Sequence, residues 1–131
     1  MISVPKTLPA LMRSTKVQQK ASKVGFDWPD ISGAIDKIEE ELSELKEAID
    51  KKDFDKSQDE LGDLLFSVVN VSRFIDVDSE EALTKSCDKF IRRFTLVEQL
   101  AKDRNVLLND LSLSELDGLW DKAKERISTD T

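Results

Sequence analysis

The distribution of helix-breaking residues constrains this chain most. All three prolines lie within the first 29 residues, and from Ile31 onward only Gly33, Gly62 and Gly118 disfavour a helix. A β-sandwich needs many turns, and this sequence has few residues that form them. The sequence therefore predicts an all-α fold, and 131 residues suit a single domain covering residues 1–131.

Apolar residues recur at helical spacing along most of the chain. The spacing predicts helices over about 8–24, 31–49, 53–75, 78–105 and 112–127. Two of them carry a stripe with steps of 4, 3, 4, 3 and 4, formed by Ile31, Ile35, Ile38, Leu42, Leu45 and Ile49, and by Leu83, Cys87, Phe90, Phe94, Val97 and Ala101. Residues 61–71 are apolar on nearly all sides, which indicates burial between neighbours. We expect a bundle of four to five helices that is completed by dimerisation.

Polar signals near helix ends support these boundaries. Asp30 or Ser32 can cap the second helix, Asp78 and Glu81 can form a capping box at the fourth, and Ser112 has an acidic residue three positions later.

Composition excludes several classes of site. The chain has no histidine and one cysteine, which excludes His/Cys zinc sites, histidine-based triads, di-iron carboxylate sites and an internal disulfide. The single thiol, Cys87, suits a reducing compartment. No apolar run approaches the roughly 18 residues of a membrane helix, and the start lacks a signal-peptide core. We expect a cytoplasmic protein that does not bind membranes.

The negative charge is confined to one stretch. Residues 36–63 hold twelve acidic and five basic side chains, a balance equal to the net charge of −7 for the whole chain. The first 26 residues hold five basic side chains and no acid. This distribution argues against nucleic acid as a partner and favours a cation site.

Four carboxylates are candidates for such a site. Glu41 and Glu44 are three residues apart on one predicted helix, and Glu60 and Asp63 are three apart on the next. A short connector makes these helices antiparallel, so the two pairs can converge. Oxygen-only ligands select Mg²⁺, with Mn²⁺ as the alternative. A solvated helix face is the competing interpretation, and for Glu41 and Glu44 the pattern alone does not choose. At Asp63 the apolar neighbours favour a site, and Gly62 predicts close approach of another segment or a ligand.

A basic cluster, Lys89, Arg92 and Arg93, lies on the fourth predicted helix, where we expect Phe90 and Phe94 to point into the core. Singly, these cations are best explained as surface charges; together they suit a polyphosphate. Trp120 is either core filler or a surface on which a base stacks.

Five ordered blocks resemble one family. The segments 40–44 (EELSE) and 60–63 (ELGD) are similar to the EExxE…ExxD signature of the MazG nucleoside triphosphate pyrophosphohydrolases. The likeness extends through residues 8–13, 24–29, 62–66 with Asn70, and 89–94, and covers about 8–127. It is greatest to the C-terminal, catalytic half of the two-domain bacterial form, whereas here there is one such domain.

The resemblance implies Mg²⁺-dependent hydrolysis of a nucleoside triphosphate to the monophosphate and pyrophosphate by an all-α homodimer, with broad base tolerance. It implies that Glu40 and Glu41 act in catalysis. The implied metal ligands are Glu41, Glu44, Glu60 and Asp63, and the implied nucleotide contacts are Lys37, Lys56, Lys89, Arg92, Arg93 and Trp120. Two alternatives remain: an enzyme selective for one pyrimidine or damaged nucleotide, and a non-catalytic helical oligomerisation or binding module.

Overall fold

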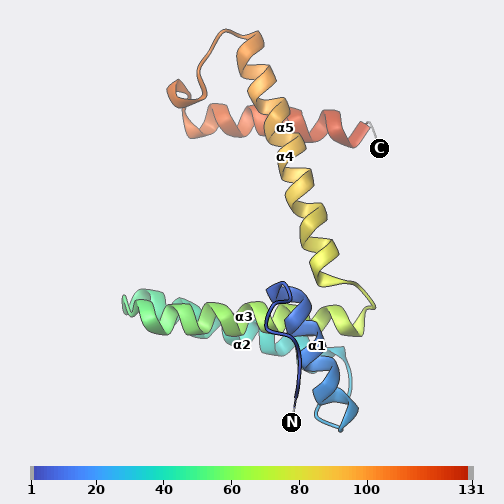
Figure 1. The fold of residues 1–131 in the computed structure, drawn as a ribbon. Helices are drawn as coiled ribbons and strands as arrows, with labels where there is room; N and C mark the ends of the chain where they lie inside the picture. Colours follow the sequence, from blue (N-terminus) through green and yellow to red (C-terminus); the bar gives the residue numbers. More distant parts are fainter. Residues whose placement is uncertain (1, 130–131) are drawn as a thin grey trace. The chain divides into compact units, whose positions relative to one another are not determined.

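The structure, a computed structural model, describes residues 2–129 and confirms the all-α prediction. Those residues form five α-helices and a short 3-10 turn, with no β-strand (Figure 1). The helices are α1 (Ala10–Lys23), α2 (Ile31–Asp50), α3 (Phe54–Phe74), α4 (Ser79–Asp103) and α5 (Leu113–Thr129), with the 3-10 turn η1 (Leu108–Asp110) before α5. No helix in the described range is both long and apolar enough to cross a membrane.

Helix starts are set by local hydrogen bonds, as the sequence indicates. Asp30 caps α2 by accepting the backbone N–H two residues on, at 2.8 Å. Asp78 accepts the backbone N–H of Glu81 at 3.0 Å at the start of α4. Before α5, Ser112 and Glu115 each accept the other's backbone N–H at 3.1 Å, a reciprocal capping box. These starts confirm the predicted boundaries within one or two residues.

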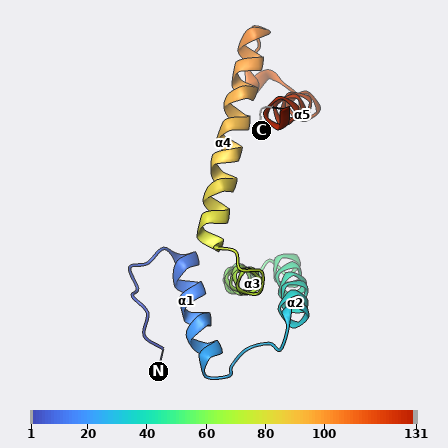
Figure 2. The ribbon, with the colours of Figure 1, turned by 90° about the vertical axis from the view of Figure 1, so that its right-hand side faces the viewer.

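The chain packs as two compact units, Met1–Ala82 and Leu83–Thr131, and α4 contributes residues to both. In the first unit α3 lies between α1 and α2, as its end-on view in Figure 2 shows. The two flanking helices contact opposite sides of α3 and leave two long edges of it uncovered.

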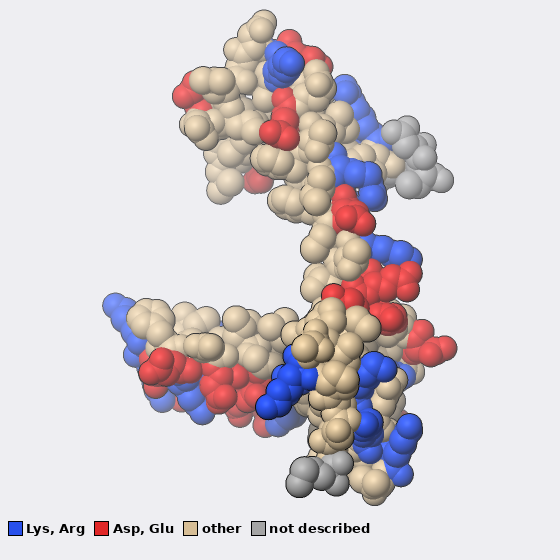
Figure 3. Space-filling view, in the orientation of Figure 1, with Lys and Arg blue, Asp and Glu red and all other residues tan. Residues whose placement is uncertain are grey.

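One uncovered edge of α3 is apolar. Leu61, Leu65 and Val68 are 47%, 52% and 48% exposed, and they follow one another at spacings of 4 and 3 on one side of the helix. The prediction that residues 61–71 are buried holds in the single chain for Ser67 and Val69 and is wrong for this edge, because α1 and α2 cover only two sides. In Figure 3 the α2–α3 pair shows uncharged atoms along one edge and charged side chains along the other.

The stripe predicted on α2 is also only partly buried. Its members Ile35, Leu42 and Ile49 remain exposed, because α3 packs against the neighbouring line of Ala34, Glu41 and Ala48. The apolar stripe thus borders the α2–α3 interface.

The second unit has its own small core where α4 and α5 meet. That core consists of Val97, Leu100, Ala101, Leu119 and Ala123. The stripe predicted on α4 is buried only at its C-terminal end. Phe90 and Phe94 are 57% and 41% exposed, so the prediction that they point into the core is wrong.

Candidate metal centre

Small side chains on α2 bring a carboxylate into the interface with α3. Ala34 and Ala48 are 0% and 4% exposed, and Glu41 lies midway between them, seven residues from each, at 5%. Seven residues are nearly two helical turns, so the three lie in one line. The alanines let the backbones approach closely, and Glu41 is buried where they do.

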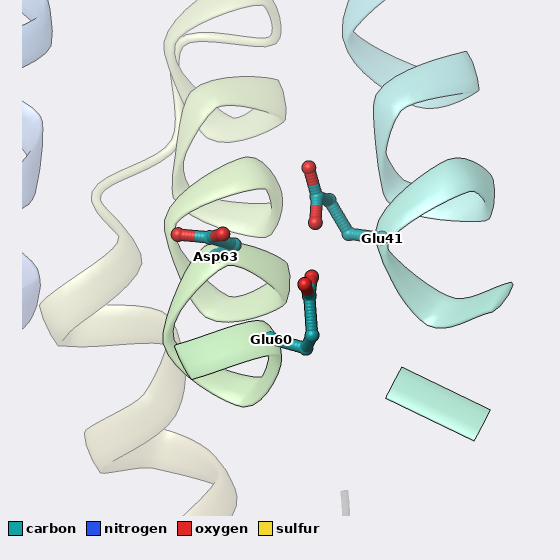
Figure 4. Close-up of side chains that lie close together, drawn as sticks. All are labelled: Glu41, Glu60 and Asp63. Atoms are coloured by element: carbon teal, nitrogen blue, oxygen red, sulfur yellow. The ribbon is translucent and has the colours of Figure 1, made fainter. Parts of the chain in front are cut away.

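Helix α3 supplies the other two carboxylates of the centre. Glu60, 3% exposed, faces α2, and Asp63 lies one turn later on an exposed edge. One carboxylate oxygen from each of Glu41, Glu60 and Asp63 lies within 4.8 Å of the others (Figure 4). The convergence of carboxylates from two antiparallel helices, expected from their spacing, is present for these three residues.

Two lysines neutralise only part of this charge. The Nζ of Lys37 lies 3.1 Å from Glu41 and 3.2 Å from Glu40, and the Nζ of Lys56 lies 3.0 Å from Glu60. The second oxygens, Oε2 of Glu41 and Oε2 of Glu60, are buried without a hydrogen-bond partner. Leaving buried carboxylate oxygens unpaired is costly. A divalent cation would satisfy them, so these residues fit Mg²⁺ or Mn²⁺.

The fourth predicted ligand, Glu44, borders the group of three. Its hydrogen bond to Glu60 and the negative charges of Glu41 and Glu60 raise the pKa of Glu44 to about 7. The pKa of Asp63 is raised by desolvation and then by nearby carboxylates. The pKa of Glu60 is lowered, mainly by its hydrogen bond to Lys56. Without a cation the carboxylates therefore compete for protons, as groups that share a small volume must.

The space beside Gly62 is open. A Cβ built there would meet nothing within 4 Å, so no other segment of the described chain approaches it. The close contact occurs at Gly33 instead, where a Cβ would lie 2.7 Å from Cε3 of Trp28. Gly33 is thus the position at which an aromatic ring packs directly on a helix backbone.

The basic cluster predicted on α4 and the predicted aromatic contact, Trp120, lie in the second unit. The guanidinium of Arg93 is 5.9 Å from the ring centre of Trp120, and its Nε is buried without a hydrogen-bond partner. Phe90 packs on the same indole at 5.3 Å between ring centres. Lys89 and Arg92 are exposed. The Arg93 guanidinium therefore lies over the Trp120 ring and keeps one N–H group without an acceptor. An anion such as a phosphate could accept a hydrogen bond from it.

A polar network between α1, α3 and the connector before α2 was missed by sequence reasoning. Arg73 donates to both carboxylate oxygens of Asp27, at 2.8 and 3.3 Å, and to Oδ1 of Asn70 at 3.0 Å. The hydrogen bond from Arg73 is the main cause of the lowered pKa of Asp27. Arg73 and Asp27 are 46 residues apart, so no local spacing reveals their pairing.

Comparison with known proteins identifies the family. Residues 32–97 match the family model described as the MazG nucleotide pyrophosphohydrolase domain. The chain belongs to the MazG family. The matched range of this MazG domain contains all four predicted ligands and the basic cluster on α4, and it ends before Trp120.

Curated relatives support the same assignment for this MazG domain. It is 49% identical over 117 residues to the nucleoside triphosphate pyrophosphohydrolase/pyrophosphatase MazG of Thermotoga maritima, covering 89% of this chain and 45% of that protein. It is 36% identical over 127 residues to the nucleoside triphosphate pyrophosphohydrolase of Escherichia coli K12, covering 94% and 48%. It is 48% identical over 124 residues to YabN of Bacillus subtilis, covering 94% of this chain and 25% of YabN. The chain thus spans about half the length of the first two relatives or less.

Proposed function

We propose that this MazG domain hydrolyses nucleoside triphosphates to the monophosphate and pyrophosphate in a Mg²⁺-dependent reaction with broad base tolerance. The observation that carries the proposal is the group of Glu41, Glu60 and Asp63, with two buried carboxylate oxygens that have no partner. Family membership and the names of two relatives support the reaction class.

Glu41, Glu60 and Asp63 would hold the ion, and Glu44 would join them once its proton is displaced. Bound Mg²⁺ supplies charge neutralisation on the phosphate oxygens and lowers the pKa of the attacking water. Because the chain has no histidine, a carboxylate takes the water's proton, and we assign this catalytic role to Glu40 and Glu41. Mn²⁺ is the alternative ion for an oxygen-only ligand set.

Positive side chains would bind the triphosphate. Lys37 and Lys56 pair with the carboxylates in the metal-free chain, and their ammonium groups become available for phosphate oxygens when a divalent ion replaces them. In the second unit, the unused Nε of Arg93 supports a phosphate contact and the Trp120 ring supports base stacking. Lys89 and Arg92 add positive charge on α4.

A second copy of the chain would cover the apolar edge of the α2–α3 pair. Soluble monomers rarely leave a contiguous apolar patch larger than a few hundred Å² exposed. Leu61, Leu65 and Val68 on α3 and Ile49 on α2 are all between 47% and 55% exposed. Sedimentation velocity should show a homodimer for the wild type and a shift towards monomer for Leu65→Glu. Glu47→Gln, at an exposed position of α2 about 200° around the helix from Ile49, should leave the dimer intact.

The reaction is tested by following phosphorus products from a mixture of nucleoside triphosphates with Mg²⁺. Pyrophosphate and monophosphates, abolished by EDTA, would support the proposal, and similar rates for each base would support broad tolerance. Orthophosphate would place the scissile bond elsewhere. No product from a folded, Mg²⁺-supplied sample would favour a binding module.

A further inference from the structure

A partly buried network centred on Arg73 fixes the orientation of one side chain on α3, that of Asn70. The Arg73 side chain is 12% exposed and grips Asp27 with two hydrogen bonds, a forked geometry that holds the guanidinium in one orientation. Its Nε also lies 3.4 Å from Oε1 of Gln18, and Gln18 donates to the backbone carbonyl of Phe66 at 3.0 Å. Residues from α1, α3 and the connector therefore immobilise Arg73.

This arrangement determines how the amide of Asn70 is oriented. Both Nε and Nη2 of Arg73 donate to Oδ1 of Asn70. A guanidinium has only donors, so the oxygen of Asn70 must face Arg73 and the NH₂ group must face away. Within residues 2–129 that NH₂ group donates to no protein acceptor, and it is not one of the buried atoms that lack a partner. It is therefore a solvent-accessible donor in a fixed orientation.

The donor lies on the same edge of α3 as Asp63. Seven residues separate them, which is 20° short of two full turns and about 10 Å along the helix axis. Glu60 lies on the adjacent side of α3, which faces Glu41 of α2. A substrate with its phosphates at the carboxylates would extend its nucleoside over a distance of this order.

We infer that Asn70 is a nucleoside-binding contact that donates hydrogen bonds from its amide to an acceptor on the nucleoside part of the substrate, and that Arg73 is the positioning residue that orients it. The inference rests on the proposed function for its substrate. An acceptor shared by all bases, pyrimidine O2 or purine N3, is compatible with broad base tolerance. A sugar hydroxyl oxygen offers the same chemistry.

Direct binding separates this contact from catalysis. We would titrate the Mg²⁺-loaded chain calorimetrically with an α,β-methylene nucleoside triphosphate, which lacks the bond to be cleaved, and with inorganic tripolyphosphate, which lacks the nucleoside. Asn70→Ala should weaken nucleotide binding about three- to tenfold, the value of one hydrogen bond, and change tripolyphosphate binding less than twofold. Gln58→Ala removes an exposed amide from another side of α3 and should change neither.

Asn70→Asp keeps the acceptor for Arg73 but removes the donor, so it should also weaken nucleotide binding while the fold is kept. Arg73→Lys should raise KM for the nucleotide with little change in kcat, because the fork that orients the amide is lost. A 2′-deoxy analogue lacks one sugar hydroxyl, and a 3-deazapurine analogue lacks the N3 acceptor. Asn70→Ala should not weaken binding of the analogue that lacks the acceptor of Asn70.

Three outcomes would overturn the inference. Equal nucleotide binding by the wild type and Asn70→Ala would show that Asn70 does not contact the nucleotide, and it would leave the proposed function intact. Parallel losses of nucleotide and tripolyphosphate binding would show a general effect on the phosphate site. Absence of any nucleotide binding by the folded wild type would contradict the proposed function as well.

Discussion

Replacing Glu60 by glutamine should remove most of the stabilisation that Mg²⁺ gives the fold. Glu60 is 3% exposed, its Oε2 has no partner, and its ligand oxygen lies within 4.8 Å of those of Glu41 and Asp63. Glutamine removes one negative charge with almost no change in volume. Its amide can donate to a neighbouring carboxylate. Because Lys56 holds the pKa of Glu60 below its usual value, the fold favours the charged carboxylate, so in EDTA the variant should unfold at a temperature no higher than that of the wild type.

With Mg²⁺ the wild type should become clearly the more stable of the two. At a Mg²⁺ concentration 100 times its Kd, binding stabilises the wild type by about 2.7 kcal/mol, which raises Tm by on the order of 10 °C. Loss of a hydrogen bond to a metal ligand weakens affinity about 10- to 100-fold, so loss of the ligand itself should cost at least about 100-fold. At the same concentration the variant then gains only about 0.4 kcal/mol, or one to two degrees.

Circular dichroism melts in EDTA and across a Mg²⁺ series measure both effects. Glu47→Gln is the matched control, because Glu47 is an exposed glutamate that pairs with a lysine four residues later, Lys51, as Glu60 is paired with Lys56 four residues before it. It should behave as the wild type does. A full Mg²⁺ shift in the Glu60→Gln variant would refute the ligand assignment. A variant more stable than the wild type in EDTA would refute the argument that Lys56 stabilises the charge of Glu60 in the metal-free fold.

Other substitutions test the remaining parts. Asp63→Asn should lower kcat at least about 100-fold and leave the helical spectrum unchanged, since it removes a ligand but little volume; retained turnover would show that Asp63 does not bind the ion. Arg93→Ala should mainly raise KM for the triphosphate, and an unchanged KM would place the phosphates elsewhere. The pKa of Glu44 rises from 4.5 to about 7 in the metal-free fold. The folded state therefore binds this proton more tightly than the unfolded state, so stability without metal should fall as pH increases from 4.5 to 7, and Glu44→Gln should weaken that dependence. Leu119→Ala in the second core should cost about 3–5 kcal/mol by denaturant unfolding, because Leu119 is 2% exposed.

The carboxylate centre could be predicted because it depends on residue spacing within single helices. An i, i+3 pair of acids on each of two antiparallel helices brings three of the four side chains together, and Glu44 lies beside them. The same spacing cannot say which oxygens become buried. That depends on Ala34 and Ala48, whose small side chains let α3 approach closely enough to enclose Glu41.

The network that orients Asn70 could not be predicted. Asp27 and Gln18 are 46 and 55 residues from Arg73, and each residue alone resembles an ordinary surface side chain in the sequence. Their pairing depends on α1 and the connector folding back against α3.

The sequence by itself determined the helical class, the positions where helices begin and which carboxylates converge between α2 and α3. These follow from backbone propensities, caps and spacing within single helices, which act over a few residues. The tertiary structure alone decided which faces are buried. It left the edge formed by Leu61, Leu65 and Val68 exposed and the space beside Gly62 open, and it buried Glu41. The physical reason is that a periodic apolar stripe identifies a face that favours burial, whereas the packing of neighbouring helices decides whether anything covers it.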